Sequence, residues 1–199
     1  MLQVNPEILL SEGDSELIVY RNCFSRYDMN EFSERIAWQQ NTIRVFGKEY
    51  DEPRLTAWYG PAYSYSSISW PAQQLPDFLI EIITELSSIC EIEFNSVLMN
   101  YYRNGIDSMG WHSDNEREMD TFCIASISLG ASRVFAWRKG KAGKSQRATL
   151  QHGDLLLMFN LQEGWQHSIP KSLRTTEPRL NMTFRRIKNP HEDGPSLFM

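Results

Sequence analysis

The sequence predicts a mainly β fold with flanking helices, an α+β arrangement in which residues 1–199 form a single domain. Two observations carry this prediction. Apolar and polar residues alternate along several segments of the second half of the chain, which is the period of half-buried strands. No helical pattern separates these segments, and strands that follow one another directly are typical of a sandwich or barrel.

The alternating segments are Val97–Tyr102, Phe122–Leu129, Val134–Arg138, Leu155–Phe159 and Leu180–Ile187. Short stretches with Gly, Asn or charged residues separate them. Residues 46–70 are rich in Pro, Gly, Ser and Tyr and are expected to form further strands and turns. The pattern therefore predicts a helix-flanked β-sandwich whose sheet lies in the C-terminal half.

One strong helix is expected to open at Pro76, because the fixed φ of proline suits the first helical turn. Its apolar stripe predicts core packing and consists of Phe78, Leu79, Ile82, Ile83, Leu86 and Ile89. A second helix is expected over Glu31–Gln40, within an N-terminal third that otherwise reads as loop.

Composition argues against several classes of protein. The formal net charge is −5, so the chain lacks overall basicity and any nucleic-acid role must depend on local patches, such as the basic run Arg133–Arg147. Three cysteines without a CxxC pair argue against a disulfide framework and favour a reducing compartment. Signal-peptide and membrane-spanning patterns are absent, so we expect a cytoplasmic protein, or a nuclear one in a eukaryote, without membrane contact.

His112 and Asp114 stand two positions apart in a segment expected to be extended, so both side chains point to one face. Together they offer a two-ligand clamp for a metal, and His167 is the candidate third ligand. Two histidines and one carboxylate suit Fe(II) and leave coordination positions open. By itself the pair is weak evidence, because structural hydrogen bonding accounts for most such pairs.

The segment 179–185 alternates apolar residues with Arg179, Asn181, Thr183 and Arg185. In a strand, one face would be apolar and the other would carry two guanidinium groups, an amide and a hydroxyl. Buried arginines are costly unless they meet anions, and a guanidinium matches a carboxylate in a forked pair. A small dicarboxylate is one expected partner, and the solvated face of an edge strand is the alternative.

Asn100 and Tyr102 share a strand face just before the His–Asp pair. Taken in order, Asn-x-Tyr, His-x-Asp, a distant His and Arg-x-Asn-x-Thr-x-Arg, the sequence resembles the AlkB family of 2-oxoglutarate-dependent dioxygenases from residue 44 to residue 187. The resemblance implies a double-stranded β-helix, or jelly roll, with its core at 94–187. It also implies a nucleotide-recognition segment at 44–75 and an N-terminal extension at 1–43.

By this resemblance His112, Asp114 and His167 bind Fe(II) at the catalytic centre, with 2-oxoglutarate as co-substrate and O2 as oxidant. Arg185 would assist the near carboxylate of 2-oxoglutarate and Arg179 would bind the far one. The full set of implied co-substrate ligands is Asn100, Tyr102, Arg179, Asn181, Thr183 and Arg185.

The resemblance further implies oxidative demethylation of 1-methyladenine and 3-methylcytosine in DNA or RNA, releasing formaldehyde, succinate and CO2. The enzyme would flip the base out of its stack and hold it between aromatic walls. The implied substrate-binding residues are Phe46, Gly47, Lys48, Trp58, Tyr63, Tyr65 and Glu116. The first three resemble a hairpin that presses on a base stack. A simple turn, and aromatics that merely pack, are the alternatives.

Two departures leave the substrate open. Asn115 stands where an acid often follows the metal motif, and the turn between Tyr59 and Tyr63 is short. The same chemistry on tRNA, on a protein or on a small molecule is therefore an alternative, as is a metal-binding jelly-roll protein without turnover. We expect a monomer.

Overall fold

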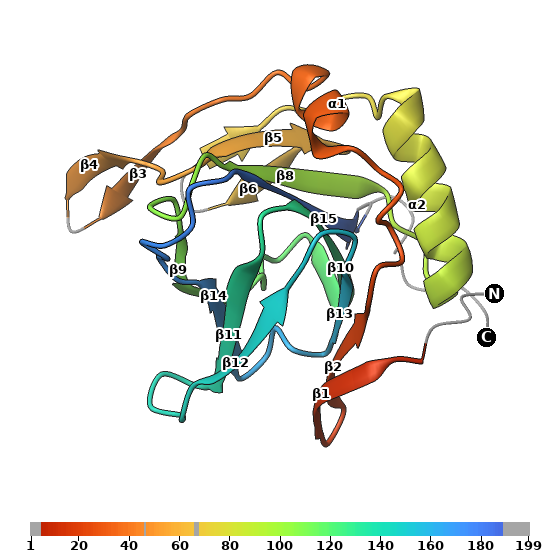
Figure 1. The fold of residues 1–199 in the computed structure, drawn as a ribbon, viewed down its shortest axis with the longest axis vertical. Coiled ribbons are helices and arrows are strands. Elements are labelled where there is room, and N and C mark those ends of the chain that lie inside the picture. Colours follow the sequence, from red (N-terminus) through yellow and green to blue (C-terminus); the bar gives the residue numbers. More distant parts are fainter. Residues whose placement is uncertain (1–4, 46, 66–67, 189–199) are drawn as a thin grey trace, which may run out of the picture.

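The computed structural model describes residues 5–45, 47–65 and 68–188, with the side chains of all of these except 44, 45, 63–65 and 68. Two antiparallel sheets form the body of the molecule, and the helix α2 (Asp77–Cys90) lies along one side of the larger sheet (Figure 1). The predicted mainly β, jelly-roll class is confirmed. Phe46 lies outside the described residues.

The major sheet has the strand order β1-β2-β13-β10-β15-β8-β5. Its strands are β1 (Glu7–Glu12), β2 (Ser15–Tyr20), β5 (Leu55–Tyr59), β8 (Ser96–Tyr102), β10 (Met119–Gly130), β13 (Leu155–Phe159) and β15 (Arg179–Ile187). The strand β15 lies between β10 and β8, which places the arginine-bearing segment in the middle of the sheet rather than at an edge. The edge-strand alternative for this segment is therefore excluded.

The minor sheet has the order β12-β11-β14-β9. Its strands are β9 (Met109–His112), β11 (Arg133–Lys139), β12 (Gln146–Leu150) and β14 (Trp165–Ile169). Two small hairpins complete the β structure, β3 (Thr42–Val45) with β4 (Lys48–Asp51), and β6 (Tyr63–Tyr65) with β7 (Ile68–Trp70). Figure 1 shows the β3–β4 hairpin projecting away from the two main sheets.

The five predicted strands correspond to β8, β10, β11, β13 and β15. In the N-terminal third the prediction of helix and loop was wrong, because β1 and β2 form a hairpin there and β2 pairs with β13 of the major sheet. Leu17 and Val19 on β2 are fully buried, so a short alternating pattern was present but overlooked.

The helix expected over Glu31–Gln40 was also misplaced. The structure has α1 (Met29–Glu34), which begins after Asp28, whose carboxylate accepts hydrogen bonds from the backbone N–H groups of Asn30 and Glu31. The helix ends early because Gln39 exchanges two backbone hydrogen bonds with Thr56 of β5. The backbone of Gln39 is thus bonded to β5 instead of to a preceding turn of helix.

The helix α2 begins directly after Pro76, as expected, and ends at Cys90; the next residue, Glu91, adopts a left-handed conformation with φ of 55°. Its buried residues are Leu79, Ile82, Ile83 and Leu86, all within the predicted stripe. They pack in one apolar cluster with the outward face of the major sheet, including Met182 and Phe184 of β15. A second apolar cluster, with Leu98, Phe135 and Ile169, fills the space between the two sheets.

Candidate active site

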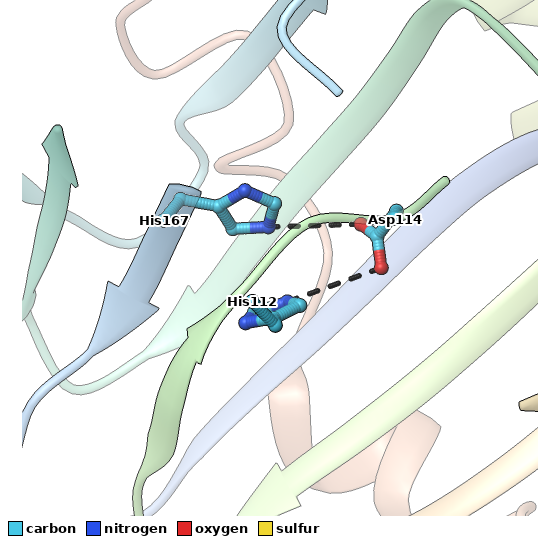
Figure 2. A group of neighbouring side chains, drawn as sticks. All are labelled: His112, Asp114 and His167. Atoms are coloured by element: carbon cyan, nitrogen blue, oxygen red, sulfur yellow. Dashed lines mark ion pairs between the residues drawn. The ribbon is translucent and has the colours of Figure 1, made fainter. Parts of the chain in front are cut away.

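The three candidate metal ligands come from two neighbouring strands of the minor sheet. His112 is the last residue of β9, Asp114 follows two positions later, and His167 lies on β14. Because β14 pairs with β9 in a register that sets His167 opposite His112, the two imidazoles project from adjacent positions. Figure 2 shows all three side chains turned toward one another.

The ligand atoms of this triad all lie within 4.8 Å of one another. His112 Nε2 is 3.9 Å from Asp114 Oδ1, and His167 Nε2 is 3.6 Å from Asp114 Oδ2. Asp114 and His167 are buried, at 2% and 5% exposed. A set of two imidazoles and one carboxylate on one side of a shared space fits Fe(II) with open positions opposite.

The protonation state of His112 suits metal binding. Its Nδ1 lies 2.8 Å from the carbonyl oxygen of Gly110, which can only accept, so Nδ1 carries the proton and Nε2 presents its lone pair. Burial lowers the pKa of His112 to about 3, His167 acts in the same direction, and Asp114 opposes the shift. The imidazole is therefore neutral at physiological pH, as a metal ligand must be.

Asp114 is held by two partners from other elements. Its Oδ1 accepts a hydrogen bond of 2.9 Å from Arg185 Nη2, and its backbone N–H donates to Gln162 Oε1 at 2.8 Å. Burial is the largest single influence and would raise the pKa of Asp114, but the Arg185 guanidinium, together with His167 and His112, outweighs it and holds the pKa well below its ordinary value. The carboxylate is thus charged and oriented before any metal arrives.

A cavity of about 420 Å³ opens beside the triad, between the two sheets. Arg179, Asn181, Thr183 and Arg185 of β15 all line it, so the polar face predicted from the alternation faces the interior. The other lining residues include Asn100 and Tyr102 of β8, together with the three metal ligands. We call this the first cavity. Every implied co-substrate ligand lines it.

Arg179 lies deep in the first cavity and is 1% exposed. Its Nη2 donates to Ser128 Oγ at 2.9 Å, whereas Nε and Nη1 have no hydrogen-bond partner among the described residues. Burial lowers the pKa of Arg179 to about 10, with Tyr102 opposing and Arg133 adding to the shift, so the guanidinium remains charged. A buried cation with unsatisfied donors is costly without an anion, and a ligand carboxylate would satisfy it.

A second cavity, of about 510 Å³, lies on the other side of His112, which lines both cavities. Its lining includes Glu52 and Arg54, which precede β5 and are 3% and 4% exposed. The sequence analysis missed both residues. Glu52, Arg54, Thr56 and Trp58 alternate along the chain and all are buried, so period-two spacing was the available signal.

The structure places the predicted substrate-binding residues unevenly. Gly47 forms the turn of the β3–β4 hairpin with φ of +77°, and Lys48 begins β4, so the expected hairpin is present. Tyr63 and Tyr65 are the ends of β6, and their side chains lie outside the described part of the chain. Glu116 lies half-buried just before β10.

Trp58 departs from its expected place. Its ring is fully buried, its Nε1 donates to the carbonyl oxygen of Pro61 at 2.8 Å, and it lines neither cavity. It packs in the apolar cluster between the sheets instead of offering an open aromatic wall. An indole with a satisfied N–H in a core gains more from packing than from exposure.

The basic run Arg133–Arg147 does not act as one surface. Arg133 is 2% exposed and donates to the carbonyl oxygens of Asn104, Asp107 and Pro170, so it holds loops together and cannot reach a phosphate. Arg138 lies over the Trp111 ring at 4.3 Å. Lys141, Lys144 and Arg147 are exposed.

Comparison with known proteins agrees with this site. Residues 19–185 match the family model described as the 2OG-Fe(II) oxygenase superfamily. A solved structure, entitled "The structure of OsALKBH1", superimposes with a TM-score of 0.64 over 90% of this chain and 100% of that one, at 14% identity. The fold and the triad thus define a 2OG-Fe(II) oxygenase as the class of protein.

Curated relatives narrow the class. The chain is 38% identical over 165 residues to the bovine (Bos taurus) alpha-ketoglutarate-dependent dioxygenase alkB homolog 3, covering 76% of this chain and 58% of that protein. It is 36% identical over 201 residues to the Rattus norvegicus protein of that name, covering 91% and 68%. It is 38% identical over 158 residues to the Homo sapiens DNA oxidative demethylase ALKBH2, covering 73% and 60%. The chain therefore belongs to the AlkB family of the 2OG-Fe(II) oxygenase superfamily.

The chain spans about three fifths of the length of the bovine and human relatives, 58% and 60% respectively. Among the described residues, no helix is both long enough and apolar enough to cross a lipid bilayer.

Proposed function

We propose that this chain is an Fe(II)- and 2-oxoglutarate-dependent dioxygenase that removes methyl groups from alkylated bases of DNA. The observation that carries the proposal is the first cavity, which combines a His–Asp–His triad with two buried arginines. The triad can hold a metal, and the two arginines can hold a dicarboxylate. A protein that only stored a metal would not need the two arginines.

His112, Asp114 and His167 would hold the iron, which when bound supplies the activation of O2. Arg179 would pair with the far carboxylate of 2-oxoglutarate through Nε and Nη1, which have no hydrogen-bond partner in the described part of the chain. Arg185 is within reach of the near carboxylate, and its bond to Asp114 keeps that ligand oriented. Asn100, Tyr102, Asn181 and Thr183 would complete the polar lining.

The overall reaction balances simply. One oxygen atom of O2 enters succinate as 2-oxoglutarate loses CO2, and the other enters the N-methyl group of the substrate to give N–CH2OH. That hemiaminal loses formaldehyde and leaves the repaired N–H. The closed apolar cluster between the sheets would keep bulk water from the oxidation.

Two observations support alkylated nucleic acid as the substrate. The second cavity shares His112 with the first, so a base bound there would lie beside the metal ligands. The relatives named above include a DNA oxidative demethylase. Gly47 and Lys48 at the projecting hairpin, with Tyr63, Tyr65 and Glu116, are proposed to contact the nucleotide, and RNA is the second candidate substrate.

The test is formaldehyde release from a single-stranded oligonucleotide bearing 1-methyladenine, with Fe(II), 2-oxoglutarate and ascorbate. We expect formaldehyde from the wild type and none from the His112→Ala variant. Succinate formation without formaldehyde would keep the oxygenase and reject the nucleic-acid substrate. A lack of both products from iron-loaded protein would favour the non-catalytic alternative.

A further inference from the structure

The second cavity contains a buried ion pair that no step of the proposed reaction uses. Glu52 and Arg54 both line this cavity, and Glu52 Oε1 accepts a hydrogen bond of 2.9 Å from Arg54 Nη2. Their side chains are 4% and 5% exposed. A charge pair taken out of water usually gives little net stabilisation, because desolvation offsets the attraction. Its presence beside the metal site therefore calls for a function in binding.

The pair is fixed from both ends. Arg54 Nε donates to Asn100 Oδ1 at 2.7 Å, which ties the guanidinium to the wall of the first cavity. Among the described residues, the second carboxylate oxygen, Glu52 Oε2, has long contacts, at 3.4 Å to Asn41 Nδ2 and 3.5 Å to Thr56 Oγ1. These distances are at the limit of hydrogen bonding, so this oxygen keeps most of its capacity to accept.

The remaining walls suit a flat, partly apolar ligand. Ile43, Pro53, Met109 and Trp111 contribute apolar surface, and Trp111 is 37% exposed with the Arg138 guanidinium 4.3 Å from the centre of its ring. A planar ring bound in this cavity would thus have aromatic and aliphatic surface around it and a carboxylate at one end. The metal ligand His112 lines the same space.

Methylated bases differ in the chemistry that a carboxylate can detect. Methylation of adenine at N1 or of cytosine at N3 leaves a cationic ring with an exocyclic amino group next to the methyl. Methylation of thymine at N3 leaves a neutral ring with a carbonyl oxygen in that position. A carboxylate attracts the first kind and repels the second, because two acceptors then face each other without a proton.

We propose that Glu52 is a specificity-determining residue, whose carboxylate accepts from the exocyclic amino group and selects cationic N-methylated bases over neutral ones. This inference rests on the proposed function. Arg54 is its positioning residue, since it holds the carboxylate in place through one oxygen and leaves the other to the ligand. Sites built to bond a substrate N–H discriminate strongly against analogues that lack it.

The test compares two nearly isosteric lesions, 3-methylcytosine and 3-methylthymine, in otherwise identical single-stranded oligonucleotides. The readout is the ratio of kcat/KM for the two, measured as formaldehyde release. This ratio is independent of the active fraction, so partial misfolding of a variant cannot alter it. We expect the wild type to prefer 3-methylcytosine by at least about tenfold, the discrimination of one charge-assisted hydrogen bond.

In Glu52→Gln we expect the ratio to fall by about tenfold or more. Glu52→Asp keeps the charge but moves the carboxylate away from the ligand, so it should lower the kcat/KM ratio severalfold. This variant tests the inference if Glu52→Gln does not fold. Asp51→Asn is the matched control, because it removes the same charge from an exposed neighbour. Its ratio should equal that of the wild type.

A wild type that handles both lesions equally, or a ratio unchanged in Glu52→Gln and Glu52→Asp, would overturn the inference while leaving the proposed function intact. Release of formaldehyde from neither lesion nor from 1-methyladenine, despite turnover of 2-oxoglutarate, would instead reject the proposed function. The two failures are thus distinguishable in one set of assays.

Discussion

The two cavities that meet at His112 are built in different ways. The first is lined largely by residues of paired strands, among them β8 and β15, whose register sets Asn181 opposite Asn100 and Arg179 opposite Tyr102. The second is lined by residues 52–54, which precede β5, by Ile43 of β3 and by residues 108–112, most of which form β9. Strand pairing on both sides fixes the first, whereas one wall of the second depends on how the connecting segment 52–54 folds.

The difference has a chemical counterpart. The first cavity offers a fixed metal and dicarboxylate site, which one reaction requires in every turnover. The second offers a buried ion pair and an exposed tryptophan, Trp111, which are features that can vary with the substrate. We therefore expect changes in the first cavity to weaken metal or 2-oxoglutarate binding for every substrate, and changes in the second to redistribute turnover among substrates.

Loss of a metal ligand should have the largest effect. In Asp114→Ala we expect neither stoichiometric iron nor formaldehyde, because the charged ligand is gone and Arg185 loses its partner. Iron analysis and the formaldehyde assay would check this, with Glu118→Ala, an exposed acid nearby, as control. Full activity of Asp114→Ala would contradict the assignment of the whole first cavity.

The apolar face of β15 should matter for stability rather than for chemistry. Met182 is fully buried against the α2 side of the sheet, so Met182→Ala should lower the free energy of unfolding by about 2–5 kcal/mol. Denaturant melts would measure it. At low temperature the folded variant should keep its KM for 2-oxoglutarate, and a large change in KM would show that the two faces of β15 are not separable.

Arg179→Met should raise the KM for 2-oxoglutarate while changing kcat little. A hydrogen bond to a charged group contributes about 1.5–3 kcal/mol, which corresponds to roughly tenfold to 150-fold in affinity. Arg174→Met, at an exposed arginine, is the control. Unchanged binding in Arg179→Met would count heavily against a dicarboxylate in the first cavity.

Trp111→Ala tests the rim of the second cavity. If a base stacks on this exposed ring, affinity for the oligonucleotide should weaken by about 1–3 kcal/mol, while the KM for 2-oxoglutarate stays constant. Fluorescence anisotropy at fixed salt would measure the affinity. An equal loss for both ligands would mean that Trp111 supports the fold and not the substrate.

A further prediction concerns the pH dependence of the metal-free protein. The pKa of His112 falls from 6.5 to about 3 on folding, so between these values the unfolded chain binds a proton that the folded chain does not. Stability should therefore decrease as the pH falls below 6.5, by up to about 1.4 kcal/mol per pH unit. His112→Gln should have a shallower slope, and an equal slope would assign the effect to other groups.

The sequence by itself determined which residues of a strand lie on the same face, because polar and apolar residues alternate along it. The period-two pattern of β15 fixed which residues share a face, and the spacing of His112 and Asp114 set both on one side of an extended segment. Such information is local, because neighbouring residues of a strand keep their relation whatever the strand packs against. The same holds for the apolar stripe of α2.

Only the tertiary structure decided what depends on distant partners. Trp58 is a core residue rather than an exposed aromatic surface, because its ring is fully buried. Arg133 is also buried, and it connects loops by donating to three backbone carbonyl oxygens. Glu52 lies beside the metal site because the segment before β5 is bonded to the residue before β9, where the Ser108 N–H donates to the carbonyl oxygen of Pro53. Burial and hydrogen bonding between residues far apart in the chain are set by long-range packing, which no short pattern encodes.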